Sequence, residues 1–290
     1  MEASATGTSW RCPSCSAVSE RAHCAECGEK RPGPHDLSVR HLIAHATESL
    51  THVDGRFLAT YRQLLLRPGA LTSAWREGVR RRFFAPFQTF LVANVAFFVL
   101  QSALHFQTLS NPLASHIGDA GASSQFYSPI ARALTQAHLA ASGRSLADYA
   151  PLFDRAVQSN ARALAILLGV GFAIVAVATF ARRGRPLGLH VVFALHFTAF
   201  FLLLDTLLMP LYGLPLGAFL QRAGAIRWWD PLFSPVLAGL LAAYWYLAAR
   251  RVYGSGGILA AAQTAVMAIT LLPVLVAYRF AVFLFTLYTT

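Results

Sequence analysis

The sequence predicts an all-α integral membrane protein with a small zinc ribbon near its N-terminal end, cytoplasmic amphipathic helices and about five transmembrane helices. The first observation is the composition: 56% of the residues are hydrophobic and only 13% are charged, against about a quarter charged in ordinary soluble domains. The second is a series of apolar segments that are long enough to cross a bilayer. The third is a group of four cysteines close together in a polar N-terminal region.

The chain divides at residues 78–100, GVRRRFFAPFQTFLVANVAFFVL, where a basic stretch runs into the first long apolar segment. Polar and basic residues dominate before this point, and apolar residues dominate after it. We therefore expect a disordered leader at residues 1–9, a zinc ribbon at 10–30, cytoplasmic amphipathic or interfacial helices at 31–84 and a multi-pass membrane domain at 85–290.

The cysteines Cys12, Cys15, Cys24 and Cys27 have the spacing C-x2-C-x8-C-x2-C. Residues 1–35 lack the apolar stretch of a secretory signal, which predicts a reducing cytosolic location that favours metal binding over disulfides. Four thiolates suit one tetrahedral Zn²⁺, and a site with all four ligands from the protein is structural. Free cysteines, a redox pair and an iron–sulfur site are the alternatives. Gly28 follows the last cysteine, so the histidine needed for covalent haem attachment is missing.

Three helical pieces are expected between the ribbon and the first span, over residues 36–53, 57–66 and 70–82. Basic amphipathic segments next to a span commonly lie in the membrane interface. The first piece carries a polar stripe that could bring imidazoles and a carboxylate onto a metal ion, or could simply face the lipid headgroups. This stripe consists of His41, His45, Glu48 and His52.

The chain has a net charge of +11, and its basic residues are distributed as the expected topology requires. Of the 24 basic residues, 12 precede the first span, 5 lie in the short loops at 182–185 and 250–251, and 6 lie in the other loops. This bias matches the positive-inside rule and disfavours nucleic acid as a partner. We expect Arg80, Arg81 and Arg82 to orient the membrane domain and to meet anionic lipid, at roughly 1 kcal/mol for each residue.

The stretch DGRFLATYRQLLLRPGALTSAWREGVRRRFFAPFQTFL, together with the cysteine ribbon, resembles the bacterial membrane-protein family called domain of unknown function 3667. The positions that carry the resemblance are Asp54, Phe57, Thr60, Arg67, Pro68, Gly69, Gly78, Arg80, Arg81, Phe84 and Pro86. Val79 departs from the pattern, because the family has a basic residue there. The resemblance covers roughly residues 10–100 and implies a bacterial membrane location, but it implies no reaction.

Spans are expected at about residues 87–106, 163–181, 189–212, 232–249 and 258–287, since about 20 helical residues cross the hydrocarbon core. Residues 107–161 are expected to form an extracytoplasmic helical segment, and a loop is expected after residue 212. Trp228 and Trp229 in that loop suit the headgroup level. Five spans and basic cytoplasmic turns place the N-terminus in the cytoplasm and the C-terminus outside it.

Two charged residues stand inside the expected spans, Asp205 in the third and Arg279 in the fifth. Counted from the cytoplasmic ends, both lie in the outer half of the bilayer, so an intramembrane ion pair is geometrically plausible. A structural latch between two helices is the first interpretation of such a pair. A proton or anion relay is the second, and snorkelling of Arg279 is the third.

No Walker A loop, nucleophile elbow, HExxH pattern or dinucleotide fingerprint is present, which disfavours an enzyme. The leading interpretation is a multi-pass bacterial inner-membrane protein whose structural zinc ribbon docks a partner at the cytoplasmic membrane surface. The alternatives are a transporter or channel component and a lipid-modifying membrane enzyme. The expected partners are membrane lipids, a protein at the cytoplasmic face and further copies of the chain.

Overall fold

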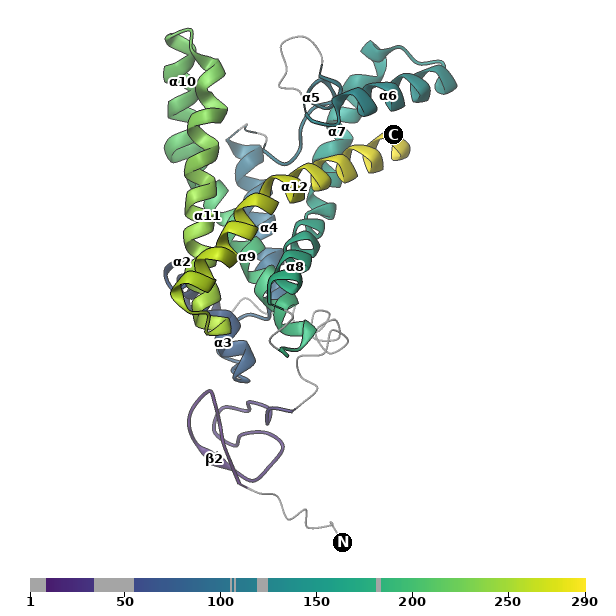
Figure 1. Cartoon of the computed structure of the whole chain (residues 1–290). Helices are drawn as coiled ribbons and strands as arrows, with labels where there is room; N and C mark the ends of the chain where they lie inside the picture. The colour runs from purple at the N-terminus through teal and green to yellow at the C-terminus, as the bar shows by residue number, and fades with distance from the viewer. Residues whose placement is uncertain (1–8, 34–54, 105, 107, 119–124, 181–183) are drawn as a thin grey trace. The chain divides into compact units, whose positions relative to one another are not determined.

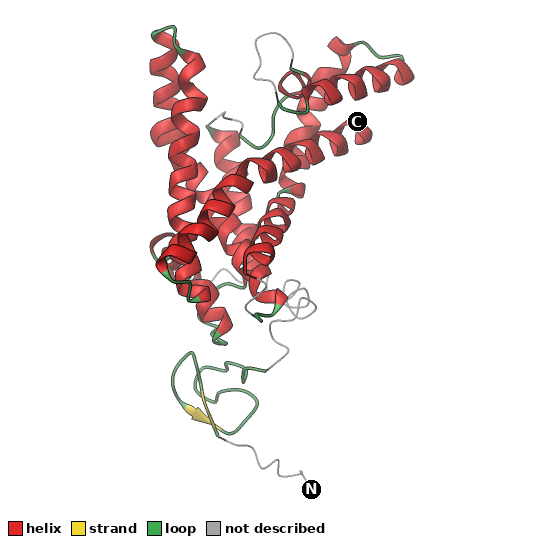
Figure 2. Cartoon of the chain, in the orientation of Figure 1, coloured by secondary structure: helices red, strands yellow, loops and turns green. Residues whose placement is uncertain are grey.

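The computed structural model describes residues 9–33, 55–104, 106, 108–118, 125–180 and 184–290, and most of this part is helical (Figure 2). The predicted all-α class is therefore confirmed. The leader up to residue 8, the first expected amphipathic helix at 36–53 and the stripe that it carries lie outside the described residues. That stripe is His41, His45, Glu48 and His52.

The N-terminal ribbon contains the two strands of the described part of the chain, β1 (Trp10–Arg11) and β2 (Val18–Ser19). They pair antiparallel, with Trp10 opposite Ser19. With two residues in each strand, the sheet has too few hydrogen bonds to stabilise a fold by itself. The apolar core of the ribbon is also small, since its buried cluster consists of Trp10, Cys12 and Cys24. The ribbon must therefore depend on something beyond its sheet and its apolar core.

Two short helices follow, α2 (Arg56–Leu66) and α3 (Ala70–Arg76). The helix expected over 70–82 ends at Arg76, because Gly78 adopts a φ of +88°, in the left-handed region that favours glycine. Residues 77–85 then form a non-helical junction before α4 begins at Pro86. Proline suits this first position, where its missing N–H has no partner in the helix.

Four helical segments of the described chain are long and apolar enough to cross a membrane: Pro86–Ala103, Leu187–Arg222, Ile226–Tyr253 and Gly257–Thr289. A fifth is possible as a bent pair, α7 (Leu146–Leu164) and α8 (Ile166–Phe180), which meet at 45°. These candidates agree with the predicted number of about five spans. The first is α4 (Pro86–Ala103), and the last is α12 (Gly257–Thr289) (Figure 1).

Where a loop is expected after residue 212, the chain instead remains helical. Helix α9 (Leu187–Leu208) continues through a π-helical turn, η3 (Met209–Gly213), into α10 (Leu214–Arg222). Pro210 and Pro215 lie inside this continuous helical stretch, where each removes one N–H donor, and the local change to π-helical hydrogen bonding fits that loss. A 3-10 turn, η4 (Ile226–Trp228), leads into α11 (Trp229–Tyr253).

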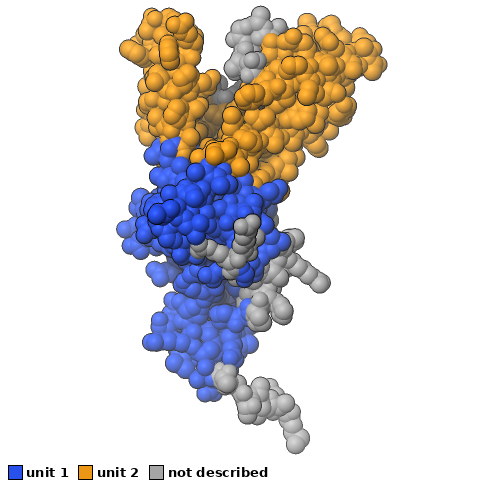
Figure 3. Space-filling model, viewed as in Figure 1, with its two compact units in different colours: residues 1–93, 173–201, 239–267 blue, residues 94–172, 202–238, 268–290 orange. Residues whose placement is uncertain are grey.

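The described chain forms two compact units, coloured blue and orange in Figure 3. Unit 1 contains residues 1–93, 173–201 and 239–267, and unit 2 contains 94–172, 202–238 and 268–290. Unit 1 has an aromatic core around Trp245, which is fully buried, with Phe193 and Phe197 each 4.8 Å from it between ring centroids. Unit 2 includes α5 (Leu113–Ile117), α6 (Ser128–Ser142) and α7, and its aromatic core includes Phe153 and Phe283.

Candidate metal centre and basic junction

The four cysteines lie on two turns with the same backbone pattern. In the first turn, the N–H of Ser16 donates to the carbonyl of Cys12, and the N–H of Cys12 donates to the carbonyl of Ala17, both at 2.8 Å. Cys24, Gly28 and Glu29 repeat these two bonds at the same length in the second turn. The C-x2-C spacing therefore folds twice into one local structure, and each copy presents two thiols on the same side.

The fifth residue of each turn lies in the left-handed region, with φ of +65° for Ser16 and +68° for Gly28. Glycine adopts this conformation without cost, whereas Ser16 is the single non-glycine residue of the described chain that adopts it. Gly28 therefore fits the second turn without strain. The matching role of Ser16 was not predicted, because serine gives no strong signal for positive φ.

The turns bring all four sulfur atoms within 4.8 Å of one another. The Sγ atoms of Cys12 and Cys27 lie 3.4 Å apart, and those of Cys15 and Cys24 lie 3.5 Å apart. A tetrahedral site with metal–sulfur bonds of about 2.3 Å would have sulfurs about 3.8 Å apart, so the set fits one metal ion. Four cysteine ligands also leave no coordination position open. The cluster that the spacing predicts is therefore formed, and it could hold a metal ion.

Main-chain amides near the cysteines change the acidity of the thiols. The amide of Cys27 lowers the pKa of the Cys24 thiol to about 7. The amide of Glu29 also lowers the pKa of the Cys27 thiol, but desolvation and the neighbouring thiols outweigh it and raise that pKa to about 12. The Cys27 thiol thus keeps its proton near neutral pH in the metal-free cluster, and metal binding must release it.

The carboxylate of Glu29 fastens the ribbon to the basic junction. Its Oε2 atom accepts the main-chain N–H groups of Arg80 at 3.0 Å and Arg81 at 2.9 Å, and the hydroxyl of Ser14 at 2.6 Å. Glu29 is only 2% exposed, so these three donors replace the water that a carboxylate normally binds. Sequence reasoning missed this residue, although an acidic side chain directly after a knuckle glycine was a usable signal.

Close packing strengthens the same attachment. Nη1 of Arg81 donates to the carbonyl of Cys27 at 3.2 Å, and a Cβ added at Gly28 would lie 2.5 Å from that nitrogen. A Cβ added at Gly78 would lie 2.6 Å from Cγ of Pro32 in the segment that follows the ribbon. Two glycines therefore allow the ribbon and the junction to approach each other.

Arg80 and Arg82, the other two junction arginines, lie over aromatic rings. The guanidinium of Arg80 lies 5.2 Å from the centroid of Trp75, and that of Arg82 lies 5.6 Å from the centroid of Phe83. Such cation–π contacts are worth roughly 0.5–1 kcal/mol each at exposed sites. These contacts orient the two guanidinium groups, whereas the sequence predicts only that the junction is basic.

Helix α2 is attached to the junction and to α4 by two polar side chains. The hydroxyl of Thr60 accepts the N–H of Phe84 at 3.0 Å and donates to the carbonyl of Arg56 at 2.7 Å. The hydroxyl of Tyr61 donates to the carbonyl of Thr89 at 2.9 Å. Burial raises the pKa of Tyr61 above its ordinary value, which keeps the phenol protonated as a donor.

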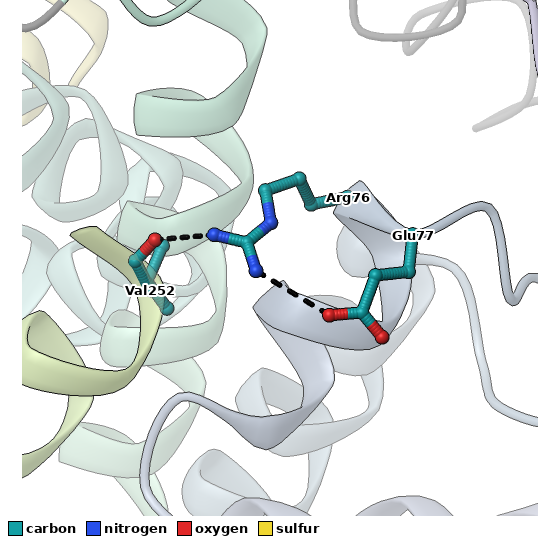
Figure 4. A network of polar contacts seen from close by, with 3 residues as sticks. All are labelled: Arg76, Glu77 and Val252. Carbon is teal, nitrogen blue, oxygen red and sulfur yellow. Dashed lines mark hydrogen bonds and ion pairs between the residues drawn. The ribbon is translucent and has the colours of Figure 1, made fainter. Parts of the chain in front are cut away.

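Helix α3 and the turn before it are hydrogen-bonded to the C-terminal end of α11. Nη1 of Arg76 donates to the carbonyl of Val252 at 2.6 Å (Figure 4), and Nη1 of Arg251 donates to the carbonyl of Pro68 at 2.6 Å. A carbonyl in the last turn of a helix has no partner within that helix, so Arg76 caps α11. The ion pair of Arg76 with Glu77 is 61% exposed on the Glu77 side and adds little stability.

The expected ion pair of Asp205 and Arg279 takes a different form in unit 2. Asp205 accepts the hydroxyl of Thr108 at 2.8 Å, and Nη2 of Arg279 donates to the carbonyl of the same threonine at 3.0 Å. Nη1 of Arg279 donates to the side chain of Gln125 at 3.2 Å, and no direct ion pair joins the two charges in the described chain. Thr108 lies between them because the segment after α4 returns to these helices, which helical depth alone does not reveal.

The fold and the cysteine cluster together define a multi-pass helical membrane protein with an N-terminal four-cysteine ribbon. Residues 54–98 match the model of the family described as Protein of unknown function (DUF3667), which confirms the resemblance predicted from the sequence. The match includes α2, α3, the junction and most of α4, and the ribbon lies outside it. No curated protein and no solved structure matches the chain.

The structure explains several positions on which the family resemblance depends. Thr60 supports the junction at Phe84, and Gly78 allows the approach of Pro32. Gly69 has a φ of +77°, and a Cβ there would lie 2.9 Å from the backbone of Ala248 in α11. These positions hold unit 1 together, while Asp54 lies outside the described residues.

Proposed function

We propose that this chain is a multi-pass protein of the bacterial cytoplasmic membrane, and that its ribbon holds one structural Zn²⁺ and docks a partner protein at the cytoplasmic face. The observation that carries this proposal is the closed set of four cysteine sulfurs within 4.8 Å of one another. The proposal extends to membrane lipids as partners and to oligomers of the chain itself.

Zinc is the metal that best suits this donor set. Thiolates are soft ligands, and a closed tetrahedral set of four is typical of structural Zn²⁺. Because all positions are filled by Cys12, Cys15, Cys24 and Cys27, no site is left for a substrate or an activated water. The metal would therefore hold the two turns together and would do no chemistry.

A docking role follows from how the ribbon is presented. Its attachment to the junction uses Glu29 and the Cys27 carbonyl, while Val18 on β2 is 72% exposed. Val18 is thus an apolar side chain on the ribbon that a partner protein could cover. The basic residues before the first span support a cytoplasmic location for the ribbon, and an odd number of spans would place the C-terminus outside.

The test uses the full-length chain. We expect one zinc per chain by elemental analysis, and substitution of Cys24→Ser should reduce it below half, whereas the exposed control Val18→Ser should keep it. A photo-crosslinker placed at Val18 in cells should capture one defined protein, and Cys24→Ser should abolish that product. A zinc content well below one in the unmodified chain would contradict the metal assignment, and a tag at Thr290 that is reactive only from the cytoplasm would contradict the topology.

The second candidate function, a transporter or channel component, is favoured by one specific observation. Asp205 and Arg279 lie in apolar helices and share Thr108, and buried charges in spans often mark ion pathways. Asp205→Asn in liposomes discriminates between the two functions. If the unmodified chain carries no proton or anion flux and Asp205→Asn lowers the abundance of the protein, the buried charges form a structural network. A flux that disappears in the variant at unchanged abundance would assign transport instead.

A further inference from the structure

Helix α2 has two faces of different character. Its three buried residues are Thr60, Tyr61 and Leu64. Largely opposite them, Leu58, Arg62 and Leu66 follow one another at intervals of four residues and form a second face, the α2 stripe. Leu58 is 72% exposed, Leu66 is 70% exposed, and Arg62 between them is exposed as well. Leucines exposed on both sides of a basic residue are typical of a helix that lies in a membrane interface.

Contacts near both ends of α2 place it at one end of the spans. Near its start, Tyr61 donates to the carbonyl of Thr89 in the first turn of α4. Just beyond its end, the carbonyl of Pro68 accepts Nη1 of Arg251 in the last turn of α11. Figure 1 shows α2 and α3 at this end of the long helices. A helix attached in this way to the ends of two spans lies at the level of the lipid headgroups.

The end of α2 also lies beside an exposed apolar part of α11. Gly69 follows α2 by three residues, and a Cβ there would lie 2.9 Å from the backbone of Ala248. The residue before Ala248 is Leu247, which is 49% exposed, and Leu240 on the same helix is 42% exposed. Exposed leucines on a span meet lipid tails, which are as apolar as leucine itself. The α2 stripe is therefore next to a surface that lipid covers.

The charge of this region selects the kind of lipid. Residues 56–76, from the start of α2 to the end of α3, contain no Asp or Glu. Arg62 lies within the stripe, and Arg67 directly after α2 is exposed as well. A guanidinium matches the oxygens of a phosphate in geometry and in charge, while the carbon stem of the side chain packs along apolar neighbours. An anionic phospholipid therefore complements the stripe better than a neutral one.

We propose that the α2 stripe inserts into the headgroup layer of the cytoplasmic leaflet and binds anionic phospholipid. Leu58 and Leu66 enter the boundary between headgroups and acyl chains, and Arg62 binds a lipid phosphate between them. The inference rests on the proposed function, since it needs the membrane location and the orientation given there. It adds the surface that meets the lipid and the class of lipid that this surface selects.

The experiment uses the full-length chain in nanodiscs of equal amounts of phosphatidylglycerol and phosphatidylcholine. A photo-reactive diazirine amino acid replaces Leu58 or Leu66, one at a time. The control for a lipid-facing position is Leu247 on α11. The control for a position away from lipid is Val18 on the ribbon, whose exposed fraction of 72% equals that of Leu58. After illumination, mass spectrometry of the intact chain identifies each attached lipid by its mass.

We expect phospholipid adducts at Leu58 and Leu66 with yields within about threefold of the yield at Leu247, and yields roughly tenfold lower at Val18. A lack of lipid adducts at both α2 positions, while Leu247 forms them, would overturn the inference. Adducts to a second copy of the chain at the stripe, in place of lipid, would overturn it as well.

The role of Arg62 is tested by the composition of the adducts. Phosphatidylglycerol should outnumber phosphatidylcholine at Leu58 and Leu66. Arg62→Gln, combined with each photo-reactive position, should lower that ratio by roughly threefold to fivefold, because it removes one positive charge from an anionic surface. Arg62→Lys keeps the charge and should keep the ratio. An unchanged ratio in Arg62→Gln, or an equal loss in Arg62→Lys, would show that the stripe does not select lipid by the charge of Arg62 and would overturn the inference.

The control at Leu247 separates this inference from the proposed function. If Leu247 forms no lipid adduct, the membrane location is wrong and both proposals fail. Lipid at Leu247 without lipid at Leu58 and Leu66 overturns the inference alone. Zinc content, measured on every sample, tests the metal assignment separately, so lipid adducts at the stripe with low zinc content would contradict only that assignment.

Discussion

The ribbon and the α5–α7 segment, residues 108–118 and 125–164, are held together in different ways. The ribbon has a buried cluster of Trp10 and two cysteines, with two strands of two residues each. The α5–α7 segment packs Tyr149 and Phe153, both fully buried, with ring centroids 6.3 Å apart. The ribbon therefore lacks an apolar core large enough to stabilise it, whereas the α5–α7 segment has such a core.

This difference in core size predicts a difference in what each region needs. A module as small as the ribbon cannot bury enough apolar surface to offset the conformational entropy that it loses on folding. It therefore needs a bound metal ion or another cross-link. In the α5–α7 segment, Phe153 lies 5.9 Å from Phe283 of α12 between ring centroids, and Tyr149 donates to the carbonyl of Leu287 at 3.3 Å. Burial of aromatic rings against α12 can hold that segment without any ion.

Removal of the metal should produce the largest difference in stability between the two regions. We expect chelation of the full-length chain to abolish hydrogen-exchange protection over residues 9–33 and to leave residues 125–164 unchanged. Structural zinc supplies roughly 10–16 kcal/mol of apparent folding free energy in small zinc modules, so its loss cannot be compensated locally. Hydrogen exchange followed by mass spectrometry reports both regions in one sample. Equal loss of protection in the two would show that they are not stabilised independently.

The converse test removes the aromatic core of the second region. Phe153→Ala should destabilise unit 2 by about 3–5 kcal/mol, because it leaves a cavity where a fully buried ring stood. Thermal unfolding in detergent measures the loss, and zinc content should stay at its original value. Phe126→Ala is the matched control, since that ring is 83% exposed and should change stability by less than about 0.5 kcal/mol. A similar cost for both variants would argue against a core at Phe153.

A pH effect should appear in the α5–α7 segment. His116 is 1% exposed, its Nδ1 lies 2.8 Å from the hydroxyl of Tyr127, and burial lowers its pKa from 6.5 to about 4. The unfolded chain therefore binds more protons than the folded chain between these values, and stability falls as the pH drops from about 6.5 toward 4. The expected loss at pH 5 is about 2 kcal/mol relative to neutral pH. His116→Gln, measured by the same unfolding at pH 5 and pH 7.5, should show a smaller difference, and an equal one would exclude this histidine as the cause.

The smallest effect concerns the left-handed position of the first turn of the ribbon. Ser16→Gly should stabilise the metal-bound ribbon by about 1 kcal/mol, because glycine accepts a φ of +65° without the side-chain clash. Competition with a zinc chelator should then require several times more chelator to remove the metal. Gly28→Ala is the opposite control, since it introduces both the φ cost and a contact at 2.5 Å with Arg81. Weaker zinc retention in Ser16→Gly would contradict the backbone explanation.

Several features could be predicted from the sequence because they are local. Apolar length predicts the helices, and C-x2-C spacing predicts a cysteine turn because four residues suffice to form it. Local signals failed where distant residues decide the structure. The end of α3 at Arg76 reflects the approach of Pro32 to Gly78, and the partner shared by Asp205 and Arg279 is Thr108, which lies 97 and 171 residues from them.

The sequence by itself determined the class of this protein, the cysteine set and the basic junction, since composition, spacing and charge placement can be read without a fold. Only the tertiary structure decided that Glu29 accepts the amides of Arg80 and Arg81, which lie 51 and 52 residues further along the chain. The physical reason is that a buried carboxylate needs donors, and only the folded chain determines which donors come within reach. That attachment places the ribbon against the basic junction.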